Sequence, residues 1–320
     1  MYRSDILWEA WKRVKANDGS GGIDGMTIDH IVKNVGEESF VNEIQKTLQN
    51  GDYHPMPARR KEIPKADGKM RPLGIPAIRD RVVQMATKMI IEPILEADFK
   101  DCSYGFRPKR NQHGAIKHIR RAVKKGVYWV VDIDIRGYFD NIAYDKLMQL
   151  VEQRISNRRV LKLIRKWLMA GFVKDDQFHE TELGSPQGGS SVRYFQIRLN
   201  YLDTIREKKF TETGTLVRFA DDLVILCKTK EQALRAIDVL KTVFGKLELE
   251  MNKEKSKLIN LWDDKQGFDF LGMHHRKIPK KLKGNKTVSL LRSYPSKKAM
   301  KNMRQKVKVA TNRETVCSGR

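Results

Sequence analysis

Apolar side chains recur at helical spacing in four stretches of the chain. In the first, Leu7, Trp11 and Val14 fall on one face of a helix, and a glycine-rich loop follows at residues 17–25. This periodicity is typical of amphipathic helices, and the glycines with neighbouring Asp and Asn indicate where the first one ends. We expect helices over residues 6–17, 39–48, 80–99 and 230–247.

Prolines and glycines exclude a helix from residues 59–76, RRKEIPKADGKMRPLGIP. Short apolar pieces flank its Ala-Asp-Gly, which predicts a β-hairpin with a two-residue turn at Asp67–Gly68. Basic side chains occupy the expected tip and arms: Lys61, Lys65, Lys69 and Arg71. Such a hairpin is often only the soluble edge of a sheet, and binding of an anion is the other interpretation.

The apolar run YWVVDIDI at residues 128–135 predicts a buried strand. Alternation along a strand places its valine and isoleucine side chains on one face and Asp132 and Asp134 on the other. An ordinary surface strand can have this pattern. Acidic residues are nevertheless poor strand formers, and two in succession on one face are unusual.

The segment LVRFADDLVILCK at residues 216–228 predicts two apolar strands joined by a polar tip that holds Asp221 and Asp222. Two carboxylates about 4 Å apart repel by about 4 kcal/mol at an effective dielectric constant of about 20. Taken alone, the pair is interpreted most simply as a solvated turn. If the strand at 128–135 lies beside this hairpin, three carboxylates converge and can hold two metal ions about 3.5–4 Å apart. Ligands that are all oxygen favour Mg²⁺ or Mn²⁺ over zinc.

Strands and helices alternate without the regular parallel pattern of a doubly wound sheet, so we expect an α+β fold. The net charge of +24 is unusual, and +14 of it lies in residues 271–320, which contain 15 Lys and Arg residues and a single acid, Glu314. Such a charge favours nucleic acid as the partner, with a solvated lysine-rich surface as the simpler alternative.

The three cysteines are Cys102, Cys227 and Cys317, which are far apart and lack the spacing of a zinc site. The sequence also has no signal-like start and no apolar run long enough for a membrane span. We therefore expect a reducing, cytoplasmic location without membrane association.

The order of segments resembles that of reverse transcriptases encoded by group II introns. IPKADGKMRPLGIP resembles their first fingers motif, and SYGFRPKRNQHGAI (103–116) resembles the segment after the long helix. The remaining matches are DIRGYFDNI to motif A, GSPQGG (184–189) to motif B, RFADD to motif C, LELEMNKEKSKLI (247–259) to motif D and FDFLGM (268–273) to motif E. Seven motifs in order, over nearly the whole chain, are far more specific than any one of them.

The resemblance implies a right-hand polymerase fold with an antiparallel palm sheet. It divides the chain into fingers (1–110), a palm with the catalytic motifs (111–275) and the basic start of a truncated thumb or maturase domain (276–320). The implied activity is RNA-directed DNA polymerisation by two-metal nucleotidyl transfer with Mg²⁺, or Mn²⁺ in its place. The implied partners are group II intron RNA as template, a DNA primer and deoxynucleoside triphosphates.

Carried over by residue, the resemblance assigns catalysis and metal binding to Asp134, Asp221 and Asp222, with Ile135 completing the metal set. Asp132 competes for the motif A role, but the family's pattern Asp-Ile-basic-Gly-aromatic-Phe begins at Asp134.

Other residues are assigned by the same resemblance to the nucleotide and the primer. The nucleotide-binding set is Lys69, Arg71, Arg136, Phe139, Gln187 and Lys255, and the primer grip is Phe270, Leu271 and Gly272. Phe139 would exclude a 2′-hydroxyl, and Lys255 would act near the pyrophosphate as a general acid. A core phenylalanine, a solvated lysine and a plain strand turn are the alternatives.

Two features depart from the family. Phe219 replaces a tyrosine before Ala-Asp-Asp, which is a mild change. After GSPQGG the chain reads SSVRYFQIRLNYLD (190–203), so Arg193 and Arg198 stand where small or apolar residues are expected beneath the palm. Because a buried unpaired arginine costs several kcal/mol, we expect either a short frame slip in the coding DNA or a helix rotated to expose the arginines.

The altered motif B and incomplete thumb keep a second function open: a catalytically impaired, RNA-binding splicing helper, or maturase fragment. An RNA polymerase of the same palm type is a third possibility, which Phe139 argues against.

Overall fold

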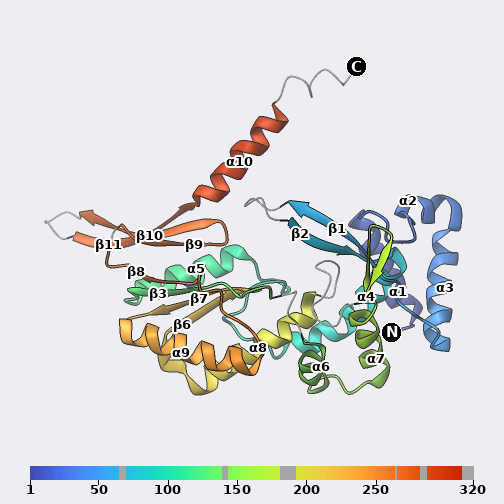
Figure 1. Cartoon of the computed structure of the whole chain (residues 1–320), viewed down its shortest axis with the longest axis horizontal. Helices are drawn as coiled ribbons and strands as arrows, with labels where there is room; N and C mark the ends of the chain where they lie inside the picture. Colours follow the sequence, from blue (N-terminus) through green and yellow to red (C-terminus); the bar gives the residue numbers. More distant parts are fainter. Residues whose placement is uncertain (65–69, 139–142, 181–191, 264, 282–286, 312–320) are drawn as a thin grey trace. The chain divides into compact units, whose positions relative to one another are not determined.

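The computed structural model describes residues 1–64, 70–138, 143–180, 192–263, 265–281 and 287–311 (Figure 1). They form two compact units, each built from separate stretches of chain. Unit 1 comprises Met1–Lys100, Gly137–Leu202 and Leu247–Leu249; unit 2 comprises Asp101–Arg136, Asp203–Lys246 and Glu250–Arg320. Both mix helices and sheets, which confirms the α+β class. The division into fingers, palm and thumb start stays a prediction.

Three helices form the first layer of unit 1: α1 (Ser4–Ala16), α3 (Glu37–Asn50) and α4 (Ile78–Glu96). Helix α1 packs against both others, and the Trp11 and Phe40 rings meet with centroids 5.2 Å apart. Helix α3 ends at Gly51, whose left-handed φ of +85° suits a glycine because it has no Cβ. A short helix α2 (Ile28–His30) and a π-helical turn η1 (Ile31–Val35) precede α3.

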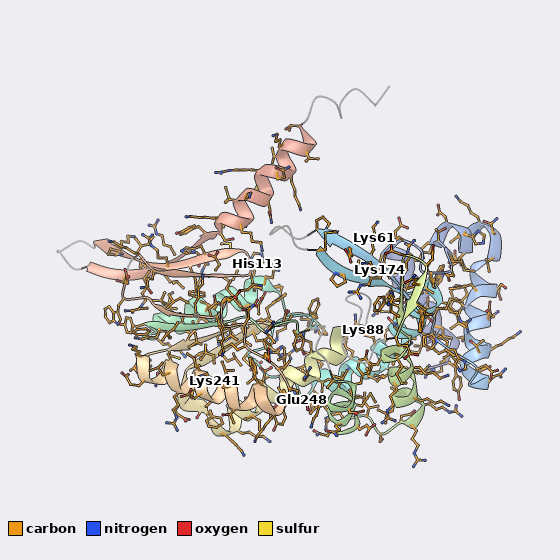
Figure 2. The ribbon with its side chains drawn as sticks, in the orientation of Figure 1. Lys61, Lys88, His113, Lys174, Lys241 and Glu248 are labelled. Carbon is orange, nitrogen blue, oxygen red and sulfur yellow. The ribbon has the colours of Figure 1, made fainter. Side chains whose placement is uncertain are left out.

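A four-stranded sheet in the order β2-β1-β4-β5 completes one side of unit 1. Its strands are β1 (Ala58–Pro64), β2 (Met70–Ile75), β4 (Phe172–Lys174) and β5 (Gln177–His179). Strands β1 and β2 are antiparallel, as predicted, whereas β1 and β4 are parallel. The expected Asp67–Gly68 turn lies outside the described residues. Figure 2 labels Lys61 on β1 and Lys174 on β4; the Lys174 ammonium lies 2.9 Å from the Glu62 carboxylate.

A buried hydrogen-bond network joins α4 to α7 (Arg158–Leu168), which follows α6 (Tyr144–Glu152). The Tyr53 hydroxyl donates to Asp80 Oδ1 at 2.7 Å and accepts from Trp167 Nε1 at 3.0 Å. The Met56 amide donates to Asp80 Oδ2 at 2.9 Å. Burial raises the pKa of Asp80 to about 6 and also raises the pKa of Tyr53.

Helix α8 (Val192–Lys209) contains the segment that departs from the family. Arg198 is fully buried, and its guanidinium donates to the carbonyl oxygens of Leu247 and Glu248. Desolvation lowers its pKa. The expectation that the helix rotates to expose the arginines is therefore wrong for Arg198, because backbone carbonyls solvate it inside the fold. The side chain of Arg193 lies outside the described part, and the frame slip stays a prediction.

The centre of unit 2 is a four-stranded antiparallel sheet in the order β6-β7-β3-β8. Its strands are β3 (Trp129–Ile133), β6 (Thr215–Phe219), β7 (Asp222–Cys227) and β8 (Lys257–Asn260). Helices α5 (Gln112–Lys124) and α9 (Lys230–Lys246) cover opposite faces of this sheet (Figure 1), and a single 3₁₀ turn, η2 (Thr211–Thr213), precedes β6. Alanine and isoleucine from α5 pack on Val130, Val217 and Val224 in one apolar core.

A three-stranded antiparallel sheet and a last helix complete unit 2. The strands are β9 (Gly267–Phe270), β10 (Met273–Lys281) and β11 (Thr287–Pro295), followed by α10 (Lys297–Ala310). Phe268 and Phe270 join the core of the larger sheet, whereas α10 has no buried residue. Among the described helices, none combines the length and apolarity that a bilayer crossing requires.

Candidate active site

The carboxylate turn, residues 219–222, joins β6 to β7. Phe219 pairs with Asp222, which leaves Ala220 and Asp221 as a two-residue turn. Ala220 has a left-handed φ of +58°. A positive φ at the first central position is typical of a type II′ hairpin turn, where glycine is usual. An L-residue there costs roughly 1–2 kcal/mol, so the rest of the fold must hold this turn in place.

Strand β3 brings its acids alongside this turn. Ile133 pairs with Leu223, so Asp134, the next residue, lies at the same end of the sheet as Asp222. Withdrawal from water, with repulsion from the Asp221 and Asp134 carboxylates, raises the pKa of Asp222 to about 6. The register therefore gathers the three predicted acids at one edge.

The fit of this edge to a divalent cation rests on its donors and its charge. Its side-chain donors are all carboxylate oxygens, which Mg²⁺ and Mn²⁺ prefer, and the raised pKa of Asp222 indicates carboxylate repulsion that a cation would relieve. In the part of the chain that is described, however, no three His, Cys, Asp or Glu side chains are close enough together to form a ready metal cage. The residues fit the ion, but the coordination sphere is not preformed.

Asp134 is held by the loop before β8, which belongs to the motif D segment. Asn252 Nδ2 donates to Asp134 Oδ2 at 3.0 Å, and the Lys255 ammonium lies 3.7 Å from the same oxygen. The Asn252 backbone amide donates to the Asp134 carbonyl at 2.9 Å, and the Asp134 backbone amide donates to Ser256 Oγ at 3.3 Å. Lys255 thus lies at the carboxylates, where the sequence predicted a site role for it.

Asp132 lies two residues further into the sheet, opposite Val224 and Lys257. Desolvation and the nearby Asp222 carboxylate raise its pKa to about 7, against the opposing effect of Lys257. Burial and the Asp222 carboxylate therefore disfavour the charged form of Asp132 next to the site. The register places Asp134, and not Asp132, at the edge with the carboxylate turn.

A buried arginine that the sequence analysis did not single out supports the turn. Arg218 and Asp203 are both almost completely buried, and the Arg218 guanidinium donates to both Asp203 carboxylate oxygens at 2.5–3.1 Å. It also donates to Ser103 Oγ at 2.8 Å and, through Nη1, to the Ala220 carbonyl at 3.0 Å. In the sequence, the signal that could have identified Arg218 is its position between the apolar residues of a strand predicted to be buried.

Cys102 and the start of the segment 103–116, here called the SYGF motif, lie along β6 and complete this support. The Arg218 amide donates to the Cys102 carbonyl, and the Tyr104 amide donates to the Arg218 carbonyl, both at 2.8 Å. A Cβ on Gly105 would lie 2.3 Å from the Ala220 amide nitrogen. Only glycine lets this segment approach the carboxylate turn so closely.

The structure describes only some of the other predicted site residues. Lys69, Phe139 and Gln187 lie outside the described residues, and Arg71 is described only as a residue of β2 that pairs with Ile63. In unit 2, the Arg136 guanidinium lies 3.4 Å from the Glu250 carboxylate. Ile135 is buried and forms a backbone bridge with Met251.

The predicted primer grip is a tight turn between β9 and β10. Leu271 and Gly272 both have positive φ, +51° and +76°, as a type I′ hairpin turn requires. Phe270 is buried in the core, so its side chain supports the turn from inside. A contact with a primer would come from Leu271 and Gly272, and stays a prediction.

Comparison with known proteins agrees with this geometry. Residues 63–275 match the family described as Reverse transcriptase (RNA-dependent DNA polymerase). The chain belongs to the reverse transcriptase family. Protein YkfC of Escherichia coli K12 is 34% identical over 297 residues, which are 81% of this chain and 76% of that protein. The group II intron-encoded protein LtrA of Lactococcus lactis is 40% identical over 192 residues, 59% of this chain but only 31% of LtrA.

These relatives confirm the resemblance to group II intron reverse transcriptases. A solved telomerase from Candida tropicalis has a similar fold, with a TM-score of 0.56 and 15% identity over 78% of this chain and 60% of that one. Telomerase from Candida albicans is similar, with a TM-score of 0.54 and 14% identity over 76% of this chain and 50% of that one. The right-hand polymerase fold predicted for this reverse transcriptase is thereby confirmed.

Proposed function

We propose that this reverse transcriptase copies an RNA template into DNA by two-metal nucleotidyl transfer, in association with a group II intron RNA. The observation that carries the proposal is the register of β3, β6 and β7, which aligns Asp134, Asp221 and Asp222 at one sheet edge. Relatives named as intron-encoded proteins and intron maturases support the intron association. A cytoplasmic location belongs to the same proposal.

Two Mg²⁺ ions at this edge would activate the primer 3′-hydroxyl and neutralise the departing pyrophosphate. The chain's own contribution is positioning. The carboxylate turn fixes Asp221 and Asp222, while Asn252 orients Asp134 through the bond to Oδ2. Lys255 supplies a mobile positive charge, with its side chain largely exposed; we assign it to the triphosphate or the departing pyrophosphate.

The substrates in this proposal are an RNA template, a DNA primer and deoxynucleoside triphosphates. Positive charge supports a polyanionic partner: β10, β11 and α10 lie within the segment that contributes +14 of the net charge. Four apolar side chains on α10 are exposed, Met300, Met303, Val307 and Val309, within the segment predicted to begin the thumb.

Substitution of a metal ligand tests the proposal. Asp222→Asn should reduce primer extension on an RNA template with Mg²⁺ by more than about a hundredfold, which exceeds the 10–100-fold typical of losing a supporting partner of a ligand. Asp238→Asn is the matched control, because Asp238 is an exposed acid of unit 2 on α9. Extension that survives Asp222→Asn would remove the metal assignment.

A splicing helper without polymerase activity is the second candidate. It is favoured by the buried Arg198 of α8, which stands where the family has small or apolar residues beneath the palm. Tight, salt-dependent RNA binding by the unmodified chain, with no primer extension at any Mg²⁺ or Mn²⁺ concentration, would select this function over the polymerase.

A further inference from the structure

An aromatic pair lies in unit 2 at the end of β3 that is remote from the carboxylates. The Tyr128 and Trp262 rings stack in parallel, with centroids 4.0 Å apart and an angle of 7° between their planes. The Leu261 amide donates to the Tyr128 carbonyl at 2.6 Å, and the Trp262 amide donates to Asn260 Oδ1 at 2.9 Å. The backbone on both sides of the pair is therefore fixed.

Trp262 remains 65% exposed although one face of its ring lies on Tyr128. Tryptophan has a large apolar surface, and leaving that surface in water forgoes the stabilisation that burial would give. A single exposed apolar residue is ordinary on a protein surface. A flat indole that is held parallel to a second ring, with its outer face open, is a preorganised surface for another planar group.

A buried lysine places positive charge beside this pair. The Lys277 ammonium lies 3.7 Å from the Tyr128 ring centroid and 5.8 Å from that of Trp262, and it donates to the Val127 carbonyl at 2.8 Å. Desolvation lowers its pKa to about 8, so most of it remains protonated at neutral pH. Its contacts in the described part are aromatic rings and a carbonyl oxygen, with no carboxylate, so its charge is not neutralised.

The surrounding charge favours an anionic partner. Exposed Lys124 and Lys125 immediately precede the turn that leads to Tyr128. Two acids follow Trp262 in the sequence, Asp263 and Asp264, against Lys124, Lys125 and Lys277. Asp263 accepts from the Lys265 amide at 2.9 Å and from Gln266 Nε2 at 3.1 Å, and Asp264 lies outside the described residues. A planar, electron-rich group attached to a polyanion is a nucleotide of a nucleic-acid strand.

We propose that the Tyr128–Trp262 pair stacks an unpaired base of single-stranded RNA, with Lys124, Lys125 and Lys277 supplying charge for its backbone. Aromatic platforms of this kind accept any base, because every base has a π-face. Tyr128 precedes Asp134 by six residues along β3, which corresponds to about 20 Å. The site is therefore a second RNA contact, separate from the carboxylates, and it does not depend on polymerase activity.

Equilibrium binding of the full chain to a labelled, unstructured RNA of about twelve nucleotides tests the site. Trp262→Ala should weaken binding about tenfold at fixed salt, whereas Trp262→Phe, which keeps a stacking ring, should stay within about threefold of the parent. Leu234→Ala is the matched control, because Leu234 is an exposed apolar side chain elsewhere in unit 2 and should have no effect.

Further probes separate stacking from charge or stability. An abasic oligomer of equal length should bind the parent and Trp262→Ala equally, and base-paired RNA should do the same. A stability loss in Trp262→Ala with unchanged RNA affinity would overturn the proposal, since Trp262 would then only cover Lys277. A weakening confined to single-stranded DNA would overturn the assignment to RNA. Primer extension on a short template should be unchanged, so failure of the polymerase proposal leaves this measurement intact.

Discussion

At the residue scale, Arg218 connects the carboxylate turn to two other parts of unit 2. Its guanidinium reaches Asp203 on α8, Ser103 in the SYGF motif and the carbonyl of Ala220. Each of these contacts replaces water that the buried charge has lost. The strained Ala220 conformation is held by the same group that neutralises Asp203, so turn geometry and core stability depend on one side chain.

Arg218→Met should lower the free energy of unfolding by about 3–5 kcal/mol, because Asp203 is left as a buried, unpaired carboxylate. The double variant Arg218→Met, Asp203→Leu should recover much of this loss in urea unfolding. It should still need more Mg²⁺ for half-maximal primer extension, because the hydrogen bond to Ala220 is absent. A double variant with the parent's Mg²⁺ requirement would show that Arg218 acts on stability alone.

Gly105→Ala should reduce primer extension more than about tenfold while the protein remains folded. The added Cβ lies 2.3 Å from the Ala220 nitrogen and 3.0 Å from the Phe219 carbonyl carbon, so backbone atoms of the turn must move. Gly245→Ala, where a Cβ meets nothing within 4 Å in α9, serves as the control and should stabilise the chain by up to about 1 kcal/mol. Equal activity of the two variants in steady-state assays would contradict this support role.

At the element scale, the network between α4 and α7 makes the stability of unit 1 depend on pH. Burial raises the pKa of Asp80 to about 6 in the folded chain, above the value of about 3.9 expected when unfolded. The folded state therefore binds this proton more tightly. The stabilisation is full below about pH 4 and is lost as the pH rises through about 6.

The difference in unfolding free energy between the parent and Asp80→Asn should therefore change by about 2–3 kcal/mol between pH 4 and 7, with the parent losing stability relative to the variant. Denaturant unfolding at several pH values measures it. If Asp80 titrates as stated, the plots of unfolding free energy against pH for the parent and for Asp80→Asn will not be parallel.

The secondary-structure elements that were predicted have local signals, whereas α5, α6, α7, β4 and β5 were not predicted. Periodicity and glycine gave helices α1, α3, α4 and α9 to within about three residues at each end, and alternation gave β3 and the β6–β7 hairpin. The approach of the SYGF motif to the turn was not predictable, since it brings Gly105 and Ala220 together across 115 positions of sequence. Nor was the solvation of Arg198, because its acceptors are backbone carbonyls, which no side-chain pattern reveals.

At the scale of the whole molecule, the charge of +24 dominates association with nucleic acid. RNA affinity should fall by about 10³–10⁵ between 50 and 200 mM salt if roughly 6–10 phosphates are contacted. A double-logarithmic plot of affinity against salt concentration measures the number of contacts. A shallow slope, corresponding to one or two contacts, would mean that the lysine-rich surface is merely solvated.

The interleaving of the two units has a consequence for synthesis on the ribosome. Unit 1 takes its last residues from Leu247–Leu249, whose carbonyls include an acceptor of Arg198, and unit 2 begins at Asp101. Neither unit can therefore be completed until about four-fifths of the chain has been translated. Until then, the segments translated first leave apolar surface exposed to solvent, and such exposure favours aggregation and binding by chaperones. Expression of residues 1–110 alone, the predicted fingers, should for this reason yield a poorly folded fragment.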